Sequence, residues 1–164
     1  MKGVLSDVRV VEHGTFITGP AASMLLADLG ADVLKVELPG TGDPFRAFKG
    51  GLYSPHYQTY NRNKRSITLN TRQADDLAKF DDLIREADVY IQNFRPGVAE
   101  QIGTGQERLR KINPKLIYCA ISGFGPTGPS VAASTARITR PTTATRRASR
   151  WTRAMRTTGR GSSS

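Results

Sequence analysis

Four basic residues close together in the sequence have the chemistry to bind a phosphorylated ligand. Arg62, Lys64, Arg65 and Arg72 stand on either side of a short predicted strand, residues 66–69. Guanidinium and ammonium groups donate charge-assisted hydrogen bonds to phosphate oxygens. The same cluster also fits a solvated run of surface charge, which is its commoner meaning. The four residues alone leave both interpretations open.

The glycine-containing turn at residues 14–20, GTFITGP, bears on which nucleotide could bind. It has neither GxGxxG nor GxxxxGK[ST], so dinucleotide and P-loop binding both lose their main support. Glu37 ends a predicted strand, where a ribose-binding acid would stand. Without the glycine fingerprint, a surface carboxylate is the better interpretation of Glu37.

Few side chains are candidates for catalysis or metal binding. Cys119 is the only cysteine and lies in an apolar run, so an internal disulfide and a cysteine metal cluster are excluded, and we expect a small buried side chain. His13 and His56 could face a ligand cleft, although a lone histidine is more often a surface or core residue. The sequence indicates no metal site.

Apolar periodicity predicts strands and helices in alternation. Pro20 suits a first helical turn and Gly30 a left-handed helix stop. Between them, apolar side chains recur at three- and four-residue intervals, which predicts a helix with an apolar face made of Ala21, Met24, Leu25 and Leu29. Strands are predicted at residues 8–12, 32–37, 66–69, 88–93 and 116–121, helices at 20–29, 73–87, 98–102 and 106–112, and long loops at 38–60 and 122–129. This order predicts an α/β fold with a Rossmann-like, mostly parallel sheet and flanking helices, which binds its ligand at the edge where the strands end.

The composition changes near residue 130. Eight of the chain's 24 basic residues and none of its 14 acidic residues lie in residues 131–164, so residues 1–130 carry a net charge of only +2. We therefore predict one domain at residues 1–130 and a basic tail at 131–164 that is rich in Arg, Thr, Ser and Ala. The tail has few large apolar residues, so we expect it to be disordered. A shifted reading frame in GC-rich DNA would produce such a composition, and we hypothesise that origin.

Five sequence blocks, taken in order, resemble the N-terminal region of the class III coenzyme A transferase family. This family, also called CaiB/BaiF, includes formyl-CoA transferases and α-methylacyl-CoA racemases. The blocks are GPAASMLLADLGADVLKVE, PGTGD, NRNKRSITLN, ADVYIQNFRPG and SGFGPTGP. The resemblance covers residues 1 to about 130 and implies a truncated Rossmann-like domain that takes coenzyme A or acyl-CoA as substrate, with no permanently bound cofactor.

The resemblance also implies where coenzyme A would bind. Arg72 would pair with a ribose phosphate, Phe94 would offer an apolar face to adenine or the pantetheine arm, and the SGFG backbone would donate amides. The candidate binding residues are Ile17, Thr18, Leu69, Asn70, Thr71, Arg72, Asn93, Phe94, Arg95, Ser122, Gly123, Phe124 and Gly125.

No catalytic residue is carried over from the family. Its transferases use an aspartate a few tens of residues beyond SGFG, where this chain has no Asp, Glu or His. The resemblance therefore implies a transferase of CoA between an acyl-CoA and a carboxylic acid, with the present chain inactive by itself. A racemase-like isomerase and a non-catalytic acyl-CoA-binding protein are the alternatives. Nucleic-acid binding through the tail ranks third, because Trp151 is its only aromatic residue.

The expected partner is an acyl-CoA molecule. The family forms interlocked homodimers, but that topology needs C-terminal segments that we do not find in this chain. The sequence has no run of about 18 apolar residues, so it predicts no membrane-spanning helix. The N-terminus does not resemble a signal peptide, so we expect a cytoplasmic protein.

Overall fold

The computed structural model describes residues 3–48, 54–123, 125 and the backbone of 135–139. Its centre is one sheet in the strand order β3-β2-β1-β4-β5-β6. The strands are β1 (Arg9–His13), β2 (Asp32–Glu37), β3 (Arg65–Thr68), β4 (Val89–Gln92), β5 (Ile117–Ser122) and β6 (Thr135–Thr139). The first five strands are parallel, which confirms the predicted mostly parallel α/β sheet.

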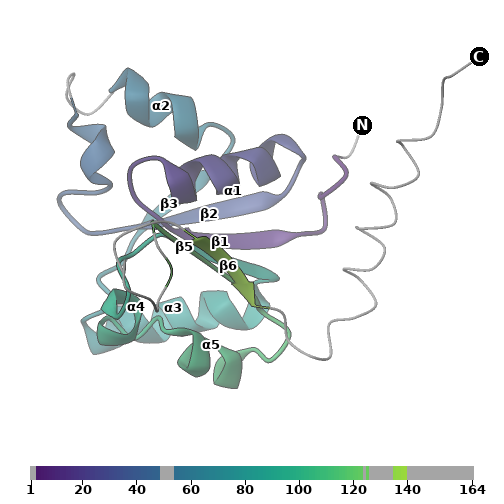
Figure 1. The fold of residues 1–164 in the computed structure, drawn as a ribbon, viewed down its shortest axis with the longest axis vertical. Coiled ribbons are helices and arrows are strands. Elements are labelled where there is room, and N and C mark those ends of the chain that lie inside the picture. Colours follow the sequence, from purple (N-terminus) through teal and green to yellow (C-terminus); the bar gives the residue numbers. More distant parts are fainter. Residues whose placement is uncertain (1–2, 49–53, 124, 126–134, 140–164) are drawn as a thin grey trace, which may run out of the picture.

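Helices cover both faces of this sheet (Figure 1). On one side lie α1 (Thr18–Asp28) and α2 (Pro55–Asn61), and on the other lie α3 (Ala74–Glu86), α4 (Val98–Gln101) and α5 (Gln106–Ile112). Strands of a parallel sheet are buried on both faces and carry apolar side chains in both directions. Here Val10 packs with the α1 side, whereas its neighbour Val11 packs with the α3 side.

The larger of the two cores lies between the sheet and α3. Phe80 and Ile84, one helical turn apart, are fully buried there with Tyr90 of β4. Asp75 and Asp76 occupy the first turn of α3 and Arg85 the last, an arrangement that complements the helix dipole. The helix predicted at residues 73–87 is confirmed.

Helix α1 departs from its predicted packing. Its buried residues are Gly19, Pro20, Ser23, Met24 and Ala27, so mostly small side chains face the sheet. Leu25 and Leu29, which the sequence places on the apolar face, are 59% and 44% exposed. The predicted stop is confirmed, because Gly30 follows the helix with φ +98°.

Two segments of regular structure were not predicted. The supposed loop at residues 38–60 contains the 3₁₀ turn η1 (Pro44–Arg46) and helix α2, each of which begins at a proline that suits a first helical position. Residues 135–139, within the tail predicted to be disordered, form β6 antiparallel to β5. A strand can add there because the outer edge of β5 offers unpaired backbone groups.

The topology leaves one natural place for a ligand. The chain runs from β1 to β2 and β3 on one side of the sheet, then returns to β4 and β5 on the other. At such a reversal the loops after the central strands diverge and leave a crevice at their carboxyl ends. Across the described part of the chain, no helix is long and apolar enough to cross a membrane.

Candidate functional site

A pocket of about 390 Å³ lies at the carboxyl ends of β1, β2, β3 and β4. Residues from the segment that follows each of these strands line the pocket, as the topology requires. The lining consists of His13, Gly14, Thr15, Val36, Glu37, Leu38, Thr41, Gly42, Asp43, Pro44, Leu69, Asn70, Thr71, Arg72, Phe94, Val98 and Ile102.

Five of the predicted binding residues line this pocket. Residues 69–72 follow β3, and Phe94 follows β4. The segment after β3 is ordered by its own contacts: the Asn70 amide donates to Asp76 Oδ2 at 2.9 Å, and Asn70 Oδ1 accepts the Arg72 amide at 3.2 Å. The hydrogen bond from the Asn70 amide lowers the pKa of Asp76, so the Asp76 carboxylate stays ionised.

The other predicted residues that the structure describes do not line the pocket. Asn93 instead holds the segment between β1 and α1. Its Oδ1 accepts the Thr15 amide, and its Nδ2 donates to the Thr15 carbonyl and to Thr18 Oγ1. Ile17 and Arg95 are exposed. Ser122 Oγ accepts the Gly125 amide at 3.0 Å, Gly123 is exposed, and Phe124 lies outside the described residues.

The basic cluster is divided by the fold. Arg62 pairs with Asp28, Arg65 pairs with Asp32, and Lys64 is buried against Glu12. Of the four, only Arg72 lines the pocket, and no ion pair involves its side chain among the described residues. Of the four, Arg72 alone therefore remains a candidate for binding phosphate in this pocket.

His13 ends β1 and lies in the pocket wall. Its ring meets Phe94 edge-on, with centroids 4.9 Å apart, and its Nδ1 lies 3.3 Å from the Tyr90 hydroxyl. Burial, together with the positive charge of Lys35, lowers the pKa of His13 to about 4. The imidazole is neutral at physiological pH, so it offers the pocket a hydrogen-bonding ring without a charge.

Glu37 is neither a surface carboxylate nor an open ribose acceptor. Its Oε1 accepts hydrogen bonds from Arg46, Tyr57 and Ser66, and its Oε2 accepts the Arg46 Nε and the Asp43 amide. Burial favours a raised pKa for Glu37, but the hydrogen bonds from Arg46, Ser66 and Asp43 outweigh it and lower the pKa to about 2. Its oxygens are occupied, so both interpretations drawn from the sequence fail.

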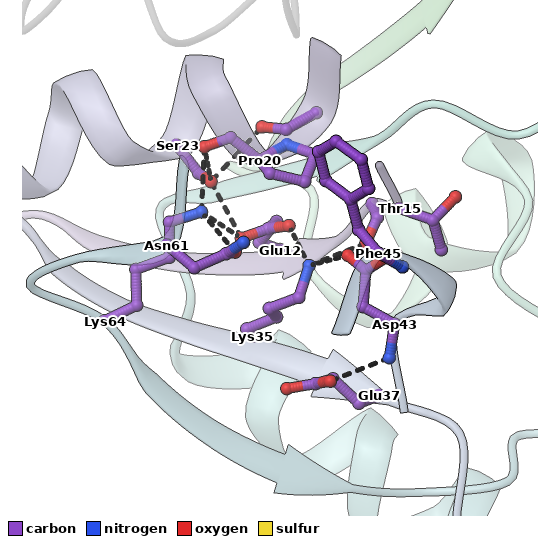
Figure 2. Close-up of polar contacts among 12 residues, drawn as sticks. Glu12, Thr15, Pro20, Ser23, Lys35, Glu37, Asp43, Phe45, Asn61 and Lys64 are labelled. Carbon is purple, nitrogen blue, oxygen red and sulfur yellow. Dashed lines mark hydrogen bonds and ion pairs between the residues drawn. The ribbon is translucent and has the colours of Figure 1, made fainter. Parts of the chain in front are cut away.

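Beside the pocket lies a buried network of charges that sequence reasoning missed (Figure 2). Lys35 Nζ lies 2.7 Å from Glu12 Oε1 and 2.9 Å from Asp43 Oδ2, and Lys64 Nζ lies 2.8 Å from Glu12 Oε2. These four side chains are at most 2% exposed, and two cations balance two anions. The sequence of β2 contained a signal for this network. Lys35 stands among valines in a strand that is covered on both faces, so its side chain must be buried there.

Ser23 and Asn61 complete this network. Ser23 Oγ donates to Glu12 Oε2 at 2.8 Å, and Lys64 Nζ donates to Asn61 Oδ1 at 3.1 Å. Burial lowers the pKa of Lys64, and the nearby Glu12 opposes that shift. The network joins β1, β2, α1 and α2 behind the pocket wall.

Cys119 lies in β5 and is partly buried, close to the predicted core position. Burial raises its thiol pKa, which keeps the sulfur in the unreactive protonated form. Within the described ranges, no group of three or more His, Cys, Asp or Glu side chains is arranged to hold a metal ion.

Two curated relatives resemble the chain closely over most of its length. It is 45% identical over 128 residues to the succinyl-CoA–D-citramalate CoA-transferase of Chloroflexus aurantiacus, which covers 76% of this chain and 32% of the relative. It is 43% identical over 130 residues to the acetyl-CoA:oxalate CoA-transferase of Acetobacter aceti, with 78% and 33% covered. The chain therefore spans about a third of the length of these relatives.

Solved structures share the fold as well as the sequence. A CAIB/BAIF family protein from Brucella suis superimposes with a TM-score of 0.76 at 39% identity, over 81% of this chain and 37% of that one. A hypothetical protein from Mycobacterium tuberculosis gives 0.74 at 34% identity, over 81% and 37%. The family model for CoA-transferase family III matches residues 5–136, past the compositional break near 130. The chain belongs to CoA-transferase family III.

Proposed function

We propose that this chain forms the coenzyme A-binding part of an enzyme that transfers CoA from an acyl-CoA to a carboxylic acid. One observation carries the proposal: residues 69–72 and Phe94, which the family resemblance assigns to CoA binding, follow different strands and yet line one pocket. Relatives that match the chain are named as CoA-transferases. A pocket at the carboxyl edge of a parallel sheet is where such a ligand is expected.

The lining suits the chemically different parts of CoA. Arg72 lines the pocket and is exposed to solvent, so its guanidinium can bind a phosphate that remains solvated. Phe94 and the neutral His13 supply aromatic surface beside it. Hydrogen bonds from charged donors to phosphate combined with aromatic stacking are a common way to hold a nucleotide.

The transfer step itself needs a nucleophile that we do not assign. In the mechanism that the resemblance implies, an aspartate carboxylate attacks the thioester carbonyl and CoA departs as the thiolate, giving an anhydride. In the pocket, the carboxylates of Glu37 and Asp43 are engaged by Arg46 and Lys35, which makes them poor nucleophiles. We propose that this chain binds CoA and that the catalytic nucleophile belongs to segments of the kind that the longer relatives possess.

Calorimetric titration of the 164-residue chain with acetyl-CoA tests the proposal. The Arg72→Ala variant should bind roughly tenfold more weakly, a loss of about 1.4 kcal/mol, because a solvent-exposed charged hydrogen bond to phosphate is removed. Arg85→Ala is the matched control, since Arg85 lies at the far end of α3 and its side chain pairs, in the described part of the chain, with the exposed Asp82. Absence of acetyl-CoA binding by the unaltered chain would overturn the proposal.

A further inference from the structure

One buried carboxylate connects the two loops that border the pocket. Asp43 lies between β2 and η1, and its Oδ1 accepts the Phe45 amide of its own loop at 2.9 Å. The same oxygen accepts the Phe16 amide, from the loop between β1 and α1, at 3.1 Å. Gly14 and Thr15 of the first loop and residues 41–44 of the second all line the pocket. The relative position of two pocket walls therefore depends on this oxygen.

The second oxygen of Asp43 reaches the first loop by another route. Oδ2 lies 2.9 Å from Lys35 Nζ, which also donates to the Gly14 carbonyl at 2.8 Å. Figure 2 shows the Lys35 ammonium between Glu12 on one side and Asp43 on the other. Asp43 is thus bound to the first loop directly through Phe16 and indirectly through Lys35 and Gly14.

The first loop holds a backbone conformation that needs such restraint. Phe16 has φ +61°, in the left-handed region that a residue with a side chain adopts at a cost. Conformations of this kind persist where surrounding contacts over-determine them, and they gather at ligand sites. The contacts here come from Asp43 at the Phe16 amide and from Asn93 at the neighbouring Thr15.

We propose that Asp43 is a positioning residue for the acyl-CoA site. It acts through the two loops, holding the pocket walls in their binding arrangement before the ligand arrives. A site that is already ordered avoids the entropy cost of ordering on binding, so loss of the restraint should appear as lost affinity. This inference rests on the proposed function, since acetyl-CoA is its probe.

Three variants of the full chain separate positioning from general stability. Asp43→Ala removes both loop contacts. Asp43→Asn keeps an oxygen for the two amides but sets an amide NH2 group, in place of the carboxylate oxygen, against the Lys35 ammonium, so it should lose stability while the loop contacts remain. Ser23→Ala is the matched control: it removes a buried hydrogen bond to Glu12 in the same network without touching either loop. Calorimetry with acetyl-CoA should give at least a tenfold loss of affinity for Asp43→Ala, less than threefold for Asp43→Asn and less than twofold for Ser23→Ala.

Amide hydrogen exchange without ligand supplies the second readout. The Phe16 amide should exchange at least tenfold faster in Asp43→Ala than in the unaltered chain, and should stay protected in Asp43→Asn and Ser23→Ala. If Asp43→Ala does not fold, Asp43→Asn decides: near-normal affinity with a protected Phe16 amide supports the inference, and a tenfold loss of affinity with that amide still protected overturns it.

The outcomes distinguish this inference from the proposed function. An unaltered chain that binds acetyl-CoA, together with an Asp43→Ala variant that binds equally well, refutes positioning and leaves the proposed function intact. An unaltered chain that binds no acetyl-CoA refutes the proposed function. In that case an unchanged Phe16 exchange rate in Asp43→Ala would also refute the restraint itself.

Discussion

Lys35 illustrates how a charged residue can be part of a protein core. Its ammonium is 1% exposed and contacts two carboxylates and one carbonyl. Taking a charge out of water is costly, and only close partners compensate for that cost. Removing Lys35 leaves Asp43 without a cation at its Oδ2, while Glu12 still has Lys64.

Lys35→Met should therefore lower the free energy of unfolding by about 3–5 kcal/mol, the range found when one partner of a buried ion pair is removed. Urea denaturation measures the change. Arg65→Met is the control, because it breaks the exposed pair with Asp32 and should cost about 0–1 kcal/mol. Equal losses in the two variants would contradict the assignment of Lys35 to a buried network.

His13 gives a pH dependence whose sign follows from its lowered pKa. The folded pKa is about 4 and the reference value 6.5, so between these pH values the unfolded chain binds the proton more readily. The contribution of His13 to stability is complete above pH 6.5 and is lost as the pH falls toward 4.

A His13→Phe variant should flatten that part of the stability profile, measured by urea denaturation at several pH values. His56→Leu, at an exposed position on α2, should keep the slope. If the His13→Phe variant kept the slope of stability against pH, that slope would have to come from other titrating groups. The ring protons of His13, followed by NMR, should shift with a midpoint near 4.

At the scale of elements, the loop from β2 to η1 is shaped by contacts as well as by backbone geometry. Gly40 and Gly42 both have positive φ values, +80° and +62°. A Cβ at Gly40 would meet open space, whereas one at Gly42 would lie 3.0 Å from Glu37 Oε2 and from Arg46 Cδ. The loop folds closely over the Glu37 carboxylate that anchors it.

Replacing each glycine by alanine separates these two effects. Gly40→Ala should cost about 1–2 kcal/mol of stability, the backbone penalty alone. Gly42→Ala should cost measurably more, because the added methyl group also displaces the Glu37–Arg46 pair. Thermal unfolding compares the two variants, and similar losses would show that the contact with Glu37 is unimportant.

At the scale of the whole molecule, the described residues form a six-stranded, mostly parallel sheet with helices on both faces, and the chain spans about a third of the length of its curated relatives. Burial of two cores is what lets an α/β unit fold. Catalysis needs additional groups placed against the thioester, and neither carboxylate in the pocket is available for that role.

We therefore expect the chain to bind acetyl-CoA without transferring CoA to an acceptor. Chromatography of CoA esters after incubation with acetyl-CoA and oxalate should show no oxalyl-CoA above a protein-free control. Saturating acetyl-CoA, at about 100 times its dissociation constant, should still stabilise the fold by about 2.7 kcal/mol. Sustained formation of oxalyl-CoA by a homogeneous preparation would contradict this expectation.

Local sequence features predicted much of the fold. The apolar periodicity of residues 73–87 and the left-handed stop at Gly30 are confirmed, because each depends on neighbours one helical turn away. The 3₁₀ turn at residues 44–46 and helix α2 were missed. They are short, and they are held by contacts such as Phe45 with His56 and Arg46 with Glu37, which join residues farther apart than one helical turn.

By itself, the sequence determined the order of the five parallel strands and of helices α1, α3, α4 and α5, the family, and the segment at residues 69–72 with Phe94 as candidate ligand contacts. Only the tertiary structure decided which charges are available to a ligand. It paired Arg62 and Arg65 with aspartates, buried Lys35 and Lys64 with Glu12 and Asp43, and left Arg72 at the pocket. The physical reason is that a residue's type fixes its charge, whereas its ion pairs depend on which distant segments the sheet brings within about 4 Å.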